Sequence, residues 1–97
     1  MITAAPIGSL RQRMLQDMKL RGLGANTQRD HIRHVRFFAA FLGCPPDTAN
    51  AEELQRFQLD QLRRAVGPAT FNAALSALRF LFTMTLKRPE IALGFSV

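Results

Sequence analysis

The apolar residues of this chain recur three and four positions apart, and runs of β-branched residues are missing. Side chains with this spacing share one face of a helix, whereas residues on one face of a strand repeat at every second position. The pattern therefore predicts an all-α fold, a compact bundle of four main helices plus a short C-terminal helix. Residues 1–8 precede the first helix and are expected to form a flexible N-terminus.

Capping residues, glycines and prolines set the boundaries of these helices. Ser, Thr or Asn favours a helix start because its side chain accepts a hydrogen bond from a free N–H group, and Gly or Pro ends a helix. The predicted helices run from Ser9 to Gly22, from Asn26 or Thr27 to Gly43, from the capping pattern Asn50–Glu53 to Gly67, from Pro68 to about Leu86, and from Pro89 to Leu93.

The 97 residues carry a formal net charge of +6. A basic balance of this size favours an anionic partner, such as nucleic acid or a membrane surface. The charge is unevenly placed, because residues 1–25 carry +3, residues 26–43 carry +2, residues 44–67 carry −1 and residues 68–97 carry +2. The segment from 44 to 67 is therefore expected to point away from the anion.

Length and composition exclude several other classes of protein. The chain is long enough for a single domain with one core. Its one cysteine, Cys44, excludes an internal disulfide, and no apolar run approaches the roughly 18 to 20 residues of a membrane span. The N-terminal residues lack the basic and long apolar regions of a secretory signal. These features predict a soluble protein of the reducing cytoplasm that has no membrane partner.

Basic side chains gather on one side of the predicted helix 26–43, at 100° per residue. The apolar side is expected to carry Thr27, His31, Val35, Phe38, Ala39 and Leu42. The opposite side is expected to carry Arg29, Arg33, Arg36 and Ala40. Arginines spaced four and three apart can neutralise successive phosphates of a nucleic acid. The alternative is an ordinary solvated helix face.

Two histidines on the same helix, His31 and His34, lie one turn apart, a spacing that can chelate zinc. A zinc site needs a third protein ligand, but Cys44 lies beyond the helix end and is followed by two prolines. His31 is on the apolar side, where a histidine is more often a packed residue. An acid/base pair would need a nucleophile or a second titrating group beside it. We therefore predict no metal ion, no cofactor and no catalytic residue.

The predicted helix that begins at Pro68 is apolar on two sides. One apolar stripe consists of Phe71, Leu75, Leu78 and Phe82, and a second consists of Ala73, Ala77, Phe80 and Met84. Between them lies a narrow polar strip of Asn72, Ser76, Arg79 and Thr83. This strip either contacts base edges and phosphates in a DNA groove or faces water. In a further alternative, Phe80 and Met84 dock a partner helix, and the chain is a protein-interaction or oligomerisation domain.

Two segments of the chain resemble a known family. The segment GLGANTQRDHIRHVRFFAAFL and, about 25 residues later, the segment GPATFNAALSALRFLFTMTLKRPE are similar to the N-terminal SAM-like, core-binding domain of tyrosine recombinases and phage-type integrases, including integron and transposon integrases. The matching residues are Gly22, Leu23, Asn26, Thr27, Val35, Phe38, Leu42, Thr70, Asn72, Leu75, Ser76, Ala77, Leu78, Arg79, Leu81 and Phe82. The resemblance implies one core-binding domain over residues 9–94. His31 departs from the family, which usually has Tyr at this position.

The resemblance also implies a role in DNA binding. Core-binding domains of this family sit on one side of duplex DNA, a following catalytic domain grips the other side, and the two form a clamp. The implied DNA-binding residues lie at the start and outer face of helix 26–43 and along and just after helix 68–86. They are Asn26, Thr27, Arg29, Arg33, Arg36, Thr70, Asn72, Ala73, Ser76, Arg79 and Lys87.

The family's reaction uses a Tyr nucleophile in the C-terminal domain, and this chain contains no Tyr. The resemblance therefore implies that the chain is a non-enzymatic first domain of a longer recombinase. Its implied partners are double-stranded DNA, the catalytic domain of the same recombinase and neighbouring protomers of a tetramer, in the cytoplasm of a bacterium.

Overall fold

The computed structural model describes residues 9–92, and every regular element in this range is helical. The elements are α1 (Ser9–Leu20), α2 (Ala25–Leu42), the 3-10 turn η1 (Pro46–Thr48), α3 (Ala51–Arg63), α4 (Pro68–Phe80), the π-helical segment η2 (Leu81–Thr85) and α5 (Pro89–Ala92). The prediction of four main helices and a short last helix is confirmed. The predicted flexible segment 1–8 and residues 93–94 of the predicted domain lie outside the described residues.

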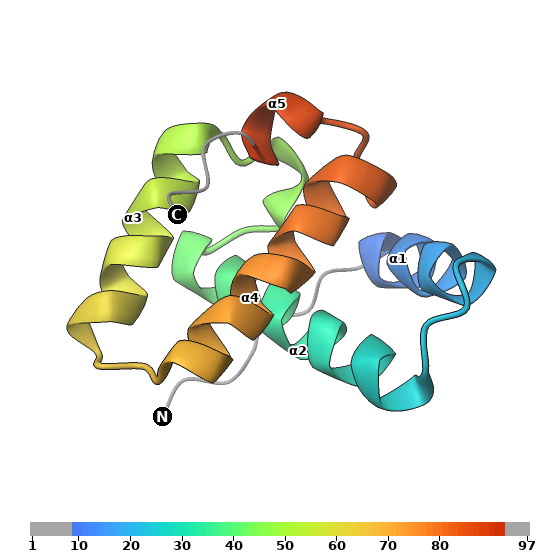
Figure 1. The fold of residues 1–97 in the computed structure, drawn as a ribbon. Coiled ribbons are helices and arrows are strands. Elements are labelled where there is room, and N and C mark those ends of the chain that lie inside the picture. Colours follow the sequence, from blue (N-terminus) through green and yellow to red (C-terminus); the bar gives the residue numbers. More distant parts are fainter. Residues whose placement is uncertain (1–8, 93–97) are drawn as a thin grey trace.

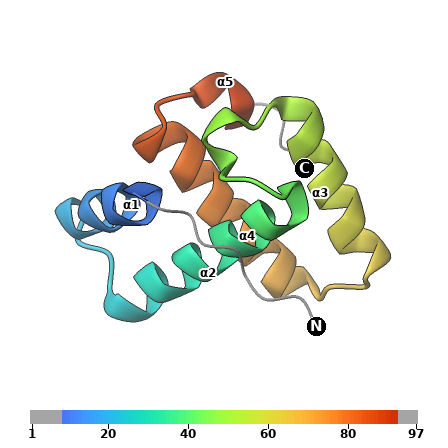
Figure 2. The ribbon, with the colours of Figure 1, turned by 180° about the vertical axis from the view of Figure 1, so that it is seen from behind.

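Helices α2 and α4 cross at the centre of the molecule, and α1 and α3 lie on either side of this pair (Figures 1 and 2). The core fills the space around the crossing. The ring of Phe38 on α2 lies edge-on to that of Phe82 at a centroid distance of 6.2 Å and to that of Phe57 on α3 at 5.0 Å. From α1, Met14 and Met18 are completely buried in the same core. Aromatic and thioether side chains therefore join α1, α2 and α3 to η2, the continuation of α4.

Three glycines were expected to end helices, and the structure confirms two of them. Gly22 and Gly43 follow α1 and α2 with φ angles of 74° and 79°, a left-handed conformation that glycine adopts without steric cost. The prediction that α3 ends at Gly67 is wrong, because α3 ends at Arg63 and Ala65 takes the left-handed conformation with φ of 55°. The bond from the Val66 N–H to the Gln61 carbonyl, 3.2 Å, closes that end early.

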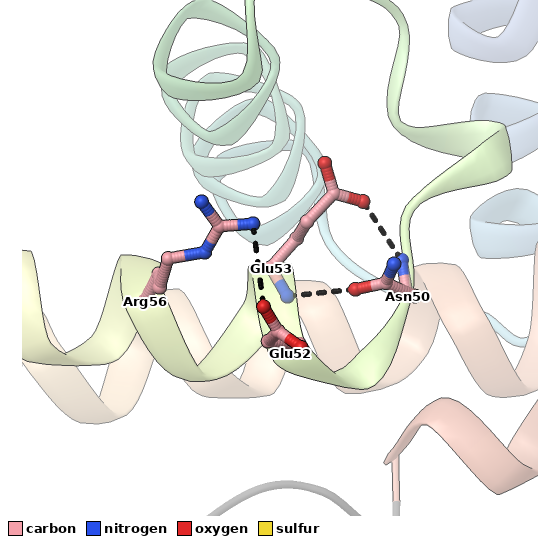
Figure 3. Close-up of polar contacts among 4 residues, drawn as sticks. All are labelled: Asn50, Glu52, Glu53 and Arg56. Carbon is pink, nitrogen blue, oxygen red and sulfur yellow. Dashed lines mark hydrogen bonds and ion pairs between the residues drawn. The ribbon is translucent and has the colours of Figure 1, made fainter.

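The helix starts differ in how they satisfy their free N–H groups. In the predicted capping pattern of α3, Asn50 Oδ1 accepts a hydrogen bond from the Glu53 N–H at 2.8 Å, and Glu53 Oε1 accepts one from the Asn50 N–H at 3.1 Å (Figure 3). By contrast, α2 begins at Ala25 after Gly24, and α4 begins at Pro68 after Gly67, and neither start has a side-chain cap or an acidic residue in its first turn. The predicted start of α2 at Asn26 or Thr27 is thus one or two residues late.

The predicted helix from Pro68 to about Leu86 is continuous but not regular. Over Leu81–Thr85 it widens into a π-helix, in which the Leu86 N–H donates to the Leu81 carbonyl at 2.8 Å. The Arg13 guanidinium on α1 donates to the Thr85 carbonyl at 3.1 Å and so ties α1 to this segment. Lys87, just beyond, has a φ of 54°. Sequence periodicity did not predict this change of winding.

Candidate nucleic-acid interface

Helix α2 supplies five of the eleven candidate DNA-binding residues, as many as α4, and its buried side is close to the predicted one. Val35, Phe38 and Ala39 are buried as expected, and Leu42 is half-buried. Thr27 was predicted on the apolar side but is exposed, because the first turn of α2 extends past its crossing with α4 (Figure 1). The buried side also includes Ile32 and His34, which the sequence analysis did not place there.

The arginine stripe of α2 forms one wall of a groove. Helix α1 forms the other wall, and the groove has a volume of about 430 Å³. It is lined by Arg11, Leu15, Ala25, Gln28, Arg29, Ile32, Arg33 and Arg36. We call this the basic groove. Sequence reasoning missed Arg11, although its spacing of four from Leu15 puts the two side chains on one face of α1.

The basic groove has little internal charge compensation. Arg33 lies 3.7 Å from Asp30, but both side chains are 57% exposed, so this ion pair contributes little stability. Within residues 9–92, Arg11 and Arg29 have no hydrogen-bond or ion-pair partner. Arg36 is half-buried. Among the residues that the structure describes, no acidic side chain lines the groove, so its walls attract anions.

Both histidines of α2 pack toward the interior. The ring of His31 contacts that of Phe80 on α4 at a centroid distance of 5.9 Å, and His34 is only 7% exposed. Burial lowers the pKa of both imidazoles below the ordinary value of 6.5, and neighbouring Asp30 opposes this shift. The interpretation of His31 as a packed residue is therefore confirmed. The described residues contain no group of three His, Cys, Asp or Glu side chains that could hold a metal ion.

The polar strip of α4 lies on the outer side of that helix. Asn72, Ser76 and Arg79 are exposed, while Thr83 is half-buried and donates its hydroxyl proton to the Arg79 carbonyl. Of the other candidates on α4, Thr70 is exposed and Ala73 is half-buried. The side chains opposite the strip, including Ala74 and Leu78, are buried. The strip is therefore exposed from Asn72 to Arg79 and partly covered at Thr83.

The structure separates the arginine stripe from the polar strip. Arg29 and Arg33 are each two residues from His31, so they point about 200° away from the side of α2 that contacts Phe80. The stripe faces α1, whereas His31, on the other face of α2, contacts Phe80 of α4. Asn26 and Thr27 are exposed at the start of α2, and Lys87 is exposed after η2. The candidate residues thus form two surfaces, one on the side of α2 that faces α1 and one on the outer side of α4.

The expected partner-binding residues are not the most exposed apolar ones. Phe80 and Met84 are half-buried, and Phe80 packs against the core. Large exposed apolar side chains lie instead on α1, α2 and α3, and a second groove of about 220 Å³ opens between α2 and α3. It is lined by Phe37, Ala40, Phe41, Phe57, Asp60, Gln61 and Arg64. We call this the aromatic groove, and the spacing of four between Phe37 and Phe41 was the signal for it.

These features define a small all-α module with a basic groove. Comparison with protein families identifies its kind: the model of the phage integrase N-terminal SAM-like domain matches residues 10–91. The chain belongs to this family, as its resemblance in sequence indicated.

One curated relative, the protein named "Putative integrase/recombinase y4qK" of Sinorhizobium fredii (strain NBRC 101917 / NGR234), is 38% identical over 80 residues. The aligned part covers 81% of this chain and 26% of the relative, so the chain spans about a quarter of that protein's length. No significant match is found among the solved structures. None of the helices within residues 9–92 has the length and apolar character needed to cross a membrane.

Proposed function

We propose that this chain is the DNA-binding module of a site-specific tyrosine recombinase or integrase. It holds one side of duplex DNA while a C-terminal catalytic domain, which supplies the Tyr nucleophile, cuts and rejoins the strands. The basic groove is the observation that carries this proposal, because four arginines and no acidic side chain are among its described lining residues. The family of the chain, that of integrase N-terminal domains, supports the same function. The absence of Tyr from the chain agrees with a binding role.

The two surfaces would make different kinds of contact with DNA. Arg29, Arg33 and Arg36, together with Lys87, would neutralise backbone phosphates. The uncapped starts of α2 and α4 leave N–H groups for phosphate oxygens, near Asn26, Thr27 and Thr70. Asn72, Ser76 and Arg79 have side chains that hydrogen-bond base edges, and Ala73 allows close approach. Most of the affinity would then come from contacts with the sugar–phosphate backbone of the DNA, and contacts from α4 would add a modest sequence preference.

The setting of this function is part of the proposal. Residues 9–94 would form one core-binding domain that clamps DNA together with the catalytic domain of the same protein. Neighbouring protomers would meet in a tetrameric complex, and the assembly would act in the bacterial cytoplasm, where the DNA is. The relative's name, which refers to integration and recombination, supports this placement.

Fluorescence anisotropy with a labelled random 30-base-pair duplex tests the proposal at several salt concentrations. We expect a dissociation constant in the micromolar range. The logarithm of the binding constant should fall linearly with the logarithm of salt concentration. Replacing Arg29, Arg33 and Arg36 by Glu should weaken binding by at least about 100-fold and reduce the salt slope by about 2.7, since each lost phosphate contact removes about 0.9.

A matched control replaces Arg56 and Arg63 of α3, and Arg64 just after it, by Glu, which changes the net charge equally but leaves both proposed DNA surfaces intact. Circular dichroism would verify that each variant is folded. The proposal is wrong if the folded wild-type chain does not bind DNA at low salt, or if the two triple variants lose affinity equally.

The aromatic groove favours a second candidate function, that of a helical protein-interaction domain. Phe37 and Phe41 remain 42% and 40% exposed there, which is unusual for side chains of this size. Sedimentation velocity without DNA distinguishes the two functions. A shift with concentration would support association through this groove, and a strict monomer at high concentration would count against it.

A further inference from the structure

We propose that α1 is part of the DNA interface, and that the basic groove seats the sugar–phosphate backbone of one strand of the duplex. Arg11 would contact this strand from the α1 wall, while Arg29, Arg33 and Arg36 would contact it from the α2 wall. The inference rests on the proposed DNA-binding function and adds to it a residue and a location for the strand.

The lining of the groove matches the chemistry of a nucleic-acid backbone. Cationic guanidinium groups stand on both walls, and the apolar side chains of Leu15 and Ile32 lie between them. A DNA strand alternates charged phosphates with the less polar faces of its deoxyriboses. Phosphates can therefore contact the arginines while a deoxyribose covers the two apolar side chains. No phosphate is then placed against an apolar side chain, and no arginine is left without an anion.

The arginine stripe is long enough to contact more than one phosphate. From Arg29 to Arg36, α2 rises about 10 Å at 1.5 Å per residue. Successive phosphates of one strand lie farther apart along the backbone than their ~3.4 Å spacing along the duplex axis, because the strand winds around that axis. A strand running along α2 would therefore present about two phosphates to this wall. Arg11 on the opposite wall then restrains the strand sideways, which a single helix face cannot do.

The groove exists before any DNA arrives, because α1 is held firmly in place. Met14 and Met18 anchor it in the core, and Arg13 donates to the Thr85 carbonyl at 3.1 Å. The left-handed Gly22 ends the helix, with a 3.1 Å bond from the Leu23 N–H to the Met18 carbonyl. Binding to a preformed groove does not require the helix that carries Arg11 to be ordered first, so only the Arg11 side chain loses freedom on binding.

The first test compares Arg11→Gln with Lys19→Gln, which removes the same charge from an exposed position of α1 outside the groove. In the anisotropy titration, Arg11→Gln should weaken binding about 5- to 10-fold and reduce the salt slope by about 0.9. Lys19→Gln should change affinity by less than about twofold. If the wild-type chain binds and the two variants behave alike, the groove is not the seat of the strand, although the DNA-binding function stands. If the wild-type chain does not bind at all, both proposals fail.

A second test separates binding from folding at Ala25, the first residue of α2, which lies exposed on the rim of the groove. A Glu at a helix start favours the helix and a Lys disfavours it, because the N-terminus carries partial positive charge. Ala25→Glu should therefore raise the melting temperature slightly and yet weaken DNA binding severalfold, whereas Ala25→Lys should do the reverse. Equal DNA affinity for the two variants would overturn the inference.

Discussion

Two grooves flank α2, one basic and one aromatic. They differ in how closely the arginines that line them are paired with acidic side chains. On the α1 side, Arg11 and Arg29 have no ion-pair partner among residues 9–92. On the α3 side, Arg64 is held by Asp60 at 2.9 Å, so the rim of the aromatic groove is nearly neutral. Arginine content alone does not make an anion site, because a nearby carboxylate cancels it.

The same comparison shows how one helix can serve two grooves. Arg36 and Phe37 are neighbours in sequence, but they point about 100° apart and line different grooves. The aromatic groove is an open edge of the core, since Phe57 in its wall contacts Phe38 at a centroid distance of 5.0 Å and Phe41 at 5.4 Å. Substitutions in the aromatic groove should therefore alter stability, and substitutions in the basic groove should alter binding.

The largest expected effect on stability comes from Phe57→Ala. Phe57 is 3% exposed, and removing its ring leaves a cavity beside Phe38, so unfolding should become easier by about 3–5 kcal/mol. Urea denaturation followed by circular dichroism measures this change. The Arg29→Glu, Arg33→Glu double variant is the control and should stay within about 0.5 kcal/mol of the wild type. A loss below about 1 kcal/mol for Phe57→Ala would show that this groove is a surface feature and not an edge of the core.

A change of pH should have a smaller effect on stability, through the two histidines that α2 packs toward the interior. Because burial lowers the pKa of His31 and His34, the unfolded chain binds protons more readily than the folded one. The stabilisation from the neutral imidazoles is complete above pH 6.5 and is lost as pH falls below this value toward the lowered folded-state pKa. Thermal melts between pH 7.5 and pH 5 should show falling stability, and the His31→Gln, His34→Gln double variant should lose part of this dependence. An unchanged pH profile in that variant would contradict the assignment.

The smallest effect should come from Asp60→Asn on the rim of the aromatic groove. The ion pair with Arg64 is largely exposed on the Arg64 side, so its loss should cost at most about 0.5–1 kcal/mol. It also frees one positive charge on α3, and the anisotropy titration should then show less than a twofold gain in DNA affinity. A tenfold gain would mean that DNA also contacts α3 and that the two grooves do not differ in function.

Much of the helical framework could be predicted from the sequence, because it depends on residues a few positions apart. The glycines after α1 and α2, the Asn50–Glu53 capping box and the start of α4 at Pro68 all act within one turn. The predictions failed where distant packing or a chain reversal intervenes. Ala65 ends α3 although it is not glycine, and the helix after Phe80 widens into a π-helix. Neither feature has a periodic signal.

The candidate site also has a part that the sequence predicts and a part that depends on tertiary packing. The spacing of four and three in α2 was enough to place Arg29, Arg33 and Arg36 on one face, since that is a property of a single helix. The sequence by itself thus determined the helices, most of the core side of α2 and the arginine stripe. Only the tertiary structure brought Arg11 beside the stripe, turned the strip of α4 away from it and opened the aromatic groove. These arrangements depend on how helices pack across long sequence separations, and local periodicity carries no information about that packing.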